Sequence, residues 1–163
     1  MAQLTKCYFD VYKTGNYVGE YYFRAEGTVM EPEAVNTPSG PFKVQGLQTS
    51  IMVPVCPTKN GKGVITTQQE HMETILNEMR KLAGPDFTKG ASGSNLESLA
   101  ATLAKAQPYF RFSTSQSAPT AEYPDPRVWE NWNGYKGLED YTPPSPDAGV
   151  EEDETEVPAA STN

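Results

Sequence analysis

The first half of the chain alternates apolar and polar residues, a pattern typical of β-strands that bury one face. It predicts a long, curved strand over about residues 17–30, rich in tyrosine and valine. A second strand, or a pair of strands, is expected over residues 42–56. Prolines and glycine in residues 31–41 predict a loop between these strands. Lys, Asn and Gly in residues 59–63 predict an exposed basic turn.

Two helices are predicted in the middle of the chain. Apolar residues recur at spacings of three and four over Gln68–Ala83, and Thr67 with Glu70 has the sequence pattern of a capping box. A shorter helix is expected to begin with a similar box at Ser94 and Glu97 and to end before the next proline. The expected fold class is therefore mixed α+β, mainly β with helical insertions.

Residues 108–134 combine aromatic side chains with arginine and four prolines, which forbid a helix through most of this stretch. Two half-buried strands joined by a proline-rich loop are predicted. Neighbouring residues of a strand point to opposite faces. Phe110 and Phe112 are therefore assigned to the core, whereas Tyr109 and Arg111 are left for a ligand.

Aromatic and cationic residues recur together in several of the predicted strands. In the first strand, alternation assigns Tyr21 and Phe23 to the core and leaves Tyr22 and Arg24 on the other face. Proteins that bind single-stranded nucleic acid combine aromatic rings, on which bases stack, with Lys and Arg that contact phosphates. Aromatic residues of β-rich domains are also common in cores, so the prediction depends on their repetition beside cations in separate strands. The residues predicted to contact nucleic acid are Tyr22, Arg24, Lys43, Lys59, Lys62, Tyr109, Arg111, Arg127 and Trp129.

Charge is distributed unevenly along the chain. The formal charge is −8 at pH 7, and eight of the 21 acidic residues lie in residues 139–163, which contain no Lys or Arg. Residues 1–138 are neutral in sum and are predicted to form one domain that can still hold a basic groove. Residues 139–163 are predicted to be a disordered acidic tail. Such a tail can increase solubility, attract a basic partner protein, or compete with nucleic acid for the groove.

The sequence contains no motif for catalysis or for a cofactor. P-loop, dinucleotide-binding, nucleophile-elbow and zinc-protease motifs are absent, and His71 is the single histidine. Cys7 and Cys56 have neither the spacing of a metal site nor that of a disulfide framework. No enzymatic activity, metal or cofactor is expected. No apolar run is long enough to cross a membrane and no signal-peptide core is present, so a soluble cytoplasmic protein without a membrane partner is expected.

Several segments together resemble the OB-fold single-stranded DNA-binding proteins, above all the divergent kind encoded by bacteriophages. They are the glycine-containing strand GEYYFRAEGTVM, the strand block VQGLQTSIMVPV, the helix TTQQEHMETILNEMRKLAG, and the closing segments PYFRFSTS and PDPRVWENWNG. An acidic carboxyl-terminal tail is similar to that class as well. The chain departs from the class in two ways. It ends VPAASTN instead of in an acidic, aliphatic and aromatic tip, and its second helix is additional to a five-stranded barrel.

The resemblance implies an OB-type β-barrel that binds single-stranded DNA without sequence preference, in replication or recombination and in the host cytoplasm if a phage encodes it. The tyrosines and Trp129 would stack bases, and the tail would dock replication or recombination proteins or inhibit the groove. The alternative is a β-rich structural or assembly protein of a virus, in which the aromatic residues form a protein interface. The dependence of binding on salt distinguishes the two functions, because phosphate contacts weaken steeply as salt is added and buried aromatic interfaces do not.

Overall fold

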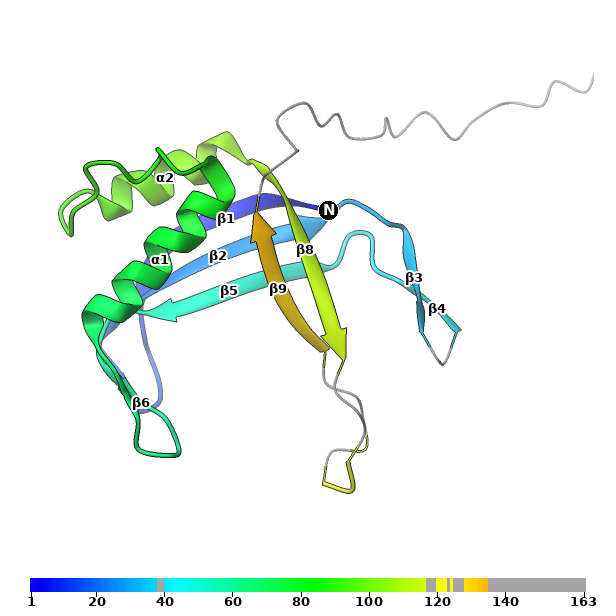
Figure 1. Cartoon of the computed structure of the whole chain (residues 1–163), viewed down its shortest axis with the longest axis horizontal. Coiled ribbons are helices and arrows are strands. Elements are labelled where there is room, and N and C mark those ends of the chain that lie inside the picture. The colour runs from blue at the N-terminus through cyan, green and yellow to red at the C-terminus, as the bar shows by residue number, and fades with distance from the viewer. Residues whose placement is uncertain (38–39, 117–119, 123, 125–127, 135–163) are drawn as a thin grey trace, which may run out of the picture.

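The computed structural model describes residues 1–37, 40–116, 120–122, 124 and 128–134 of the 163-residue chain (Figure 1). The predicted acidic tail over residues 139–163 and the predicted phosphate contact of Arg127 lie outside these residues. The described residues form mostly strands together with two helices, so the mixed α+β class is confirmed.

Five strands form one antiparallel sheet (Figure 1). Its order is β5 (Gln48–Pro54), β2 (Tyr21–Val29), β1 (Ala2–Val11), β8 (Tyr109–Gln116) and β9 (Val128–Gly134). A bulge interrupts the register of β1 with β2 between Leu4 and Lys6. Bulges increase the local twist of a strand. This bulge separates the start of β1, which also pairs with β8, from the rest of the strand.

The five strands do not close into a barrel within the part of the chain that the structure describes, where β5 and β9 are the two edges. One side-chain hydrogen bond joins these edges, because Trp132 Nε1 on β9 donates to Thr49 Oγ1 on β5 over 2.9 Å. Both side chains are buried. The sheet therefore curves until its edges meet through side chains instead of through backbone hydrogen bonds.

The helix predicted over Gln68–Ala83 is confirmed with both of its bounds and is α1. Its N-terminus carries the expected capping box. Glu70 N donates to Thr67 Oγ1 over 3.2 Å, and Thr67 N donates to Glu70 Oε2 over 2.7 Å. Three apolar side chains of the helix are buried in the core: Ile75, Met79 and Leu82.

The second helix, α2 (Leu96–Ala106), begins two residues after the predicted start at Ser94, and the expected box of Ser94 and Glu97 does not form. Ser94 Oγ lies 2.8 Å from Ser92 Oγ, and Asn95 occupies the cap position. The Asn95 side chain accepts a hydrogen bond from Ser92 N, so it closes the preceding turn instead of capping the helix. Neither α1 nor α2, the helices of the described residues, is long and apolar enough to cross a membrane.

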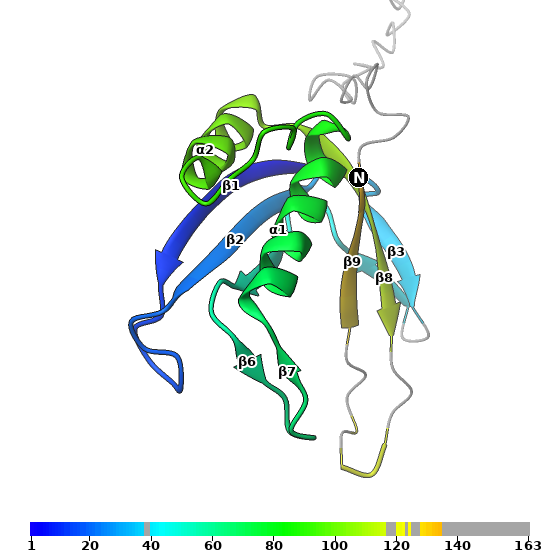
Figure 2. The same cartoon turned by 60° about the vertical axis from the view of Figure 1, so that its left-hand side comes forward.

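Both helices pack on the same face of the sheet, and the core lies between them and the strands (Figure 2). Phe110 on β8 is fully buried there, and its ring centroid lies 4.2 Å from that of Trp132. Gly27 on β2 leaves room for the Phe110 ring, since a Cβ atom at this position would lie 2.7 Å from it. The predicted core positions of Phe23 and Phe110 are confirmed, and Phe112 is partly buried against the same core.

The core prediction for Tyr21 is wrong, because its side chain is 54% exposed. Tyr21 is the first residue of β2 and precedes the buried stretch that begins at Phe23. Alternation assigns a residue to a face of a strand, but it does not say how far along the strand the core extends.

Two hairpins extend from opposite ends of the sheet. Residues 31–41, predicted as a loop, contain β3 (Ala34–Thr37) and the start of β4 (Gly40–Lys43), so the predicted strand over 42–56 is divided between β4 and β5. The predicted basic turn connects β6 (Thr58–Lys59) with β7 (Ile65–Thr66). Two-stranded ribbons bury little apolar surface, so apolar alternation does not mark them in the sequence.

Candidate nucleic-acid interface

The helices leave the second face of β1, β2 and β5 without a covering helix among the described residues (Figure 2). The strand register aligns Tyr8, Arg24 and Met52 across this surface, which we call the open face. Tyr22 and Arg24 share it, as alternation predicts. The side chains of the open face belong to Gln3, Lys6, Tyr8, Asp10, Tyr22, Arg24, Glu26, Thr28, Gln48, Ser50, Met52 and Pro54.

Three tyrosines gather at one end of the open face. The ring centroid of Tyr12 lies 4.8 Å from that of Tyr22 and 6.1 Å from that of Tyr17, with interplanar angles of 52° and 47°. All three side chains are half-buried, so part of each ring stays accessible. We call Tyr12, Tyr17 and Tyr22 the tyrosine cluster. Tilted rings at such distances stabilise a fold and also offer π-faces to a base.

The sequence prediction contained Tyr22 but missed Tyr12 and Tyr17. Tyr12 follows the end of β1 by one residue, and Tyr8, four residues earlier, lies on the open face. The period of two from Tyr8 to Tyr12 was the available signal. Using it required knowing that β1 pairs with β2, which is a contact between distant residues.

Exposed lysines occur on the segments next to the tyrosine cluster. Lys59 N donates to Tyr17 Oη over 3.3 Å, so the β6–β7 ribbon lies beside the cluster. Lys13, Lys59 and Lys62 are all exposed, and none of them forms an ion pair within the described residues. Accessible lysines next to aromatic rings are the combination that single-stranded nucleic acid requires.

Arg24 is less available than these lysines. Arg24 Nε lies 2.8 Å from Glu26 Oε1, and Lys6 Nζ lies 3.3 Å from Glu26 Oε2. The carboxylate therefore balances part of both positive charges in the middle of the open face. A phosphate there has to compete with Glu26 for Arg24.

Tyr109 and Arg111 lie at the other end of the sheet. Tyr109 pairs with Gln3, which pairs with Thr28 of β2. Thr28 is six residues from Tyr22, a distance of about 20 Å along a strand. The structure therefore separates Tyr109 and Arg111 from Tyr22 and Arg24, although the sequence prediction grouped all four.

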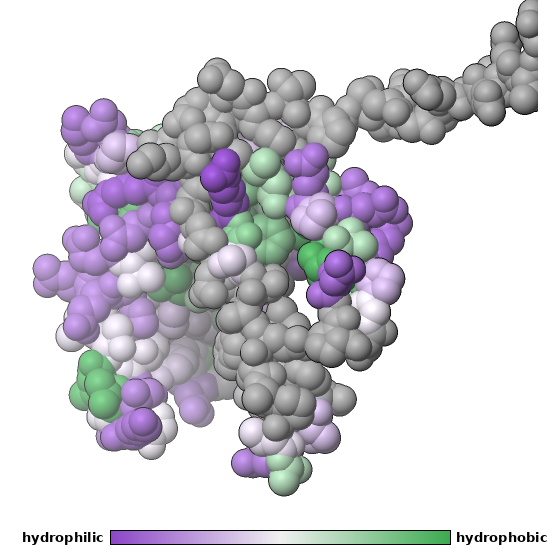
Figure 3. Space-filling view, turned by 45° about the vertical axis from the view of Figure 1, so that its right-hand side comes forward, coloured by the Kyte–Doolittle hydropathy of each residue, from purple (hydrophilic) through white to green (hydrophobic). Residues whose placement is uncertain are grey.

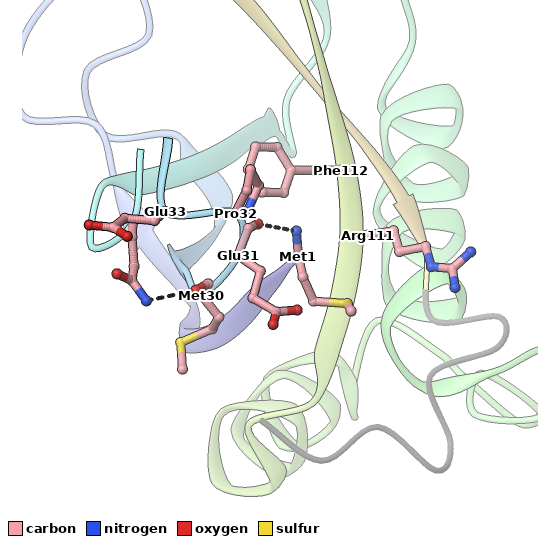
Figure 4. A pocket seen from close by; sticks show the side chains of 8 residues that line it. Met1, Met30, Glu31, Pro32, Glu33, Arg111 and Phe112 are labelled. Atoms are coloured by element: carbon pink, nitrogen blue, oxygen red, sulfur yellow. Dashed lines mark hydrogen bonds between the residues drawn. The ribbon is translucent and has the colours of Figure 1, made fainter. Parts of the chain in front are cut away.

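Arg111 lines a shallow pocket of about 780 Å³ beside the β3–β4 hairpin (Figure 4). The other lining residues are Met1, Met30, Glu31, Pro32, Glu33, Gln45 and Phe112. The Met1 ammonium donates to Glu31 O over 2.8 Å, and Gln45 Nε2 donates to Met30 O over 3.1 Å. Burial lowers the pKa of the Met1 amine. The walls thus combine thioether and aromatic groups with carboxylates and one guanidinium.

The remaining predicted residues are scattered. Lys43 is the exposed last residue of β4 and follows Phe42, whose side chain is 54% exposed. Trp129 is in β9, where its backbone pairs with Ser115 and its side chain lies outside the described part of the chain. From the predicted set, the structure thus places Tyr22 and Arg24 on one face, with the backbone of Lys59 beside Tyr17 of the tyrosine cluster.

The titratable residues of the described chain are scattered through the fold. No group of three or more His, Cys, Asp or Glu side chains is positioned to hold a metal within that part. Cys7 and Cys56 are both buried and unbonded to each other, and burial raises the pKa of the Cys7 thiol to about 12. His71 Nε2 lies 2.9 Å from Thr58 Oγ1 and connects α1 to β6.

Comparisons with known proteins add no relative. No family model matches the chain, and neither a curated protein nor a solved structure matches it. The function therefore has to be argued from the open face and the tyrosine cluster themselves.

Proposed function

We propose that the protein binds single-stranded DNA without sequence preference, through the open face around the tyrosine cluster. The observation that carries the proposal is the tyrosine cluster: the ring of Tyr12 lies beside those of Tyr22 and Tyr17, and the backbone N–H of Lys59, a residue with an exposed side chain, donates to Tyr17 Oη. Bases would stack on the tyrosines, and Lys13 and Lys59 would contact phosphates. Binding would release counterions and weaken steeply with salt.

The strand order supports an OB-type fold as part of this proposal. The order β5-β2-β1-β8-β9, with α1 between β5 and β8, is that of a five-stranded OB barrel left open between its third and fifth strands. The Trp132–Thr49 hydrogen bond joins the same two strands. OB folds bind oligonucleotides on the face of strands 2 and 3 and on the loop after strand 1. Here these are the open face of β2 and β5 and the residues that follow β1, including Tyr12 and Tyr17.

A role in replication or recombination fits this binding mode. The acidic residues 139–163 would compete with DNA for Lys13 and Lys59, or recruit partner proteins. Sequence-independent contacts suit such a role because stacking and phosphate contacts do not distinguish bases.

Titration of labelled oligo-dT with the full chain, followed by fluorescence anisotropy at two salt concentrations, tests the proposal. Tight binding at low salt that weakens steeply with added salt is expected. A chain with Lys13→Ala and Lys59→Ala should bind more weakly, with a smaller salt slope by about two counterions. Lys105→Ala is the matched control, because Lys105 is exposed on α2, on the covered side of the sheet. Absence of binding at low salt would refute the proposal.

The second candidate, an assembly or structural protein of a virus, is favoured by a different observation. Phe42 on β4 and Ile65 on β7 are 54% and 62% exposed, so large apolar side chains are available to a protein partner. This candidate predicts a protein complex that survives added salt and no affinity for oligo-dT.

A further inference from the structure

The turn between β6 and β7 projects from the body of the protein and is followed by exposed apolar residues (Figure 2). Asn60 Oδ1 accepts hydrogen bonds from both Lys62 N and Val64 N over 2.9 Å, which fixes the turn. Val64 and Ile65, directly after it, are 59% and 62% exposed. The base of the ribbon is tied to the body by the contact between Thr58 and His71. A preformed projection loses little conformational entropy when it binds.

The pocket beside the β3–β4 hairpin offers a complementary surface. Its apolar walls include Met30 and Phe112, and methionine side chains adapt readily to a partner's shape. Glu33 lies on the hairpin side of the pocket, whereas the Arg111 guanidinium extends away from Glu33 and Glu31 on the opposite side (Figure 4). The hairpin side is therefore acidic. In Figure 3, apolar surface lies next to the hollow on the side of the molecule that carries β3 and β4.

The ribbon and the pocket lie at opposite ends of the sheet. β6 follows the end of β5 that pairs with Tyr22, and the pocket residue Met30 follows the end of β2 beyond Thr28. These ends are about 20 Å apart. At this separation the two surfaces of one molecule do not meet, but those of two molecules can.

We propose that the ribbon tip of one copy docks into the pocket of a second copy. Val64 and Ile65 would pack against the methionines and Phe112, and Lys62 would pair with Glu33. The two contact surfaces differ, so the interface is heterologous, and repeated docking gives head-to-tail chains or rings.

Head-to-tail docking brings the tyrosine-cluster end of one copy next to the Arg111 end of the next. The inference does not depend on the proposed function, because the contact involves protein alone. If the open face binds a DNA strand, the docking would make that binding cooperative, since neighbours on one strand have a high effective concentration. The contact is small, so free copies are expected to associate weakly.

Sedimentation velocity of the full chain without DNA, at low salt and rising protein concentration, tests the proposal. The wild-type sedimentation coefficient should rise continuously with concentration. Lys62→Glu and Glu33→Lys should each weaken association about tenfold, because each places like charges opposite each other. An equimolar mixture of the two variants should recover association, since each variant then meets a partner of opposite charge.

An apolar variant separates docking from general charge effects. Ile65→Ser should weaken association, whereas Val35→Ser, at an exposed position of β3 outside the pocket lining, should not. A monomeric wild type at every concentration would overturn the proposal, as would association that the mixture of charge variants fails to restore. A wild type that stays monomeric is also the result expected if the chain's own residues 135–163 fill the pocket. Oligo-dT titration of Ile65→Ser checks the open face separately, so failure of DNA binding and failure of docking are distinguishable.

Discussion

The two faces of β2 differ in what their side chains contact. Phe23 and Ala25 point to the helices and are fully buried, whereas Tyr22 and Arg24, their direct neighbours, lie half-buried on the open face. One face is closed by α1, α2 and the Phe110 ring. The other has no covering helix within the described residues and carries rings and charges. The stability of the fold and the proposed affinity for DNA therefore depend on alternate residues of one strand, and substitutions can change one without the other.

Removal of a core ring should have the largest effect on the covered face. Phe110→Ala is expected to lower the free energy of unfolding by about 3–5 kcal/mol, because the buried ring leaves a cavity next to Trp132. Urea unfolding followed by circular dichroism measures this loss. Phe42→Ala, at an exposed position, should change stability by less than about 0.5 kcal/mol. Similar losses for both variants would contradict the assignment of the core.

Overfilling the same face should be costly as well. In Gly27→Ala the new Cβ atom would lie 2.7 Å from the Phe110 ring and 3.0 Å from Gln3 O, so the ring or β1 has to move. A loss of about 1–3 kcal/mol in the free energy of unfolding is expected. Gly61→Ala is the control, because a Cβ atom at Gly61 meets no atom within 4 Å. Equal unfolding midpoints of the two variants would show that the close approach is relaxed at no cost.

Neighbouring tyrosines test the open face. Tyr22→Ala should reduce the affinity for oligo-dT by about 1–3 kcal/mol, because it removes a stacking surface of the tyrosine cluster. Tyr21→Ala removes an equally large, 54% exposed side chain from the opposite side of the same strand and should leave affinity unchanged. Anisotropy titrations measure both. If Tyr21→Ala proves as harmful as Tyr22→Ala, the open face is not the contact surface.

The carboxylate in the middle of the open face should oppose binding. Glu26→Gln leaves the charges of Arg24 and Lys6 unbalanced, so affinity for oligo-dT at low salt is expected to rise about threefold, with a steeper salt slope. Glu97→Gln, which removes one negative charge from α2, controls for net charge. An equal rise for both variants would mean that Glu26 acts only through the net charge of the protein.

Features that depend on residues close in sequence could be predicted, whereas features that depend on contacts between distant residues could not. The bounds of α1 follow from its own residues, since the Thr67–Glu70 box and the apolar spacing lie within one segment. The start of α2 was missed because Ser94 bonds to Ser92 instead of the helix. The alternation of β2 predicted the face of Tyr22. It did not predict the contact of the Tyr22 ring with Tyr12, because Tyr12 follows another strand, β1.

The candidate site depends on distant contacts even more strongly. The ion pairs of Glu26 combine a neighbour on the same strand, Arg24, with Lys6 from β1. Alternation in β2 was enough to put Arg24 and Glu26 on one face, but only the β1–β2 register adds Lys6. The separation of Tyr109 from Tyr22 likewise follows from where β8 pairs with β1, which no local pattern encodes.

The smallest expected effect concerns the capping box at the N-terminus of α1. The Thr67 backbone N–H and side chain lower the pKa of Glu70 below its ordinary value of 4.5. A lowered carboxyl pKa means that the folded state favours the charged form. The contribution of the box is therefore present above that ordinary value and is lost as pH falls through the lowered pKa. NMR titration should place the Glu70 pKa below its ordinary value, and Thr67→Val should raise it towards that value. An unchanged Glu70 pKa in that variant would mean that the box does not act on this carboxylate in solution.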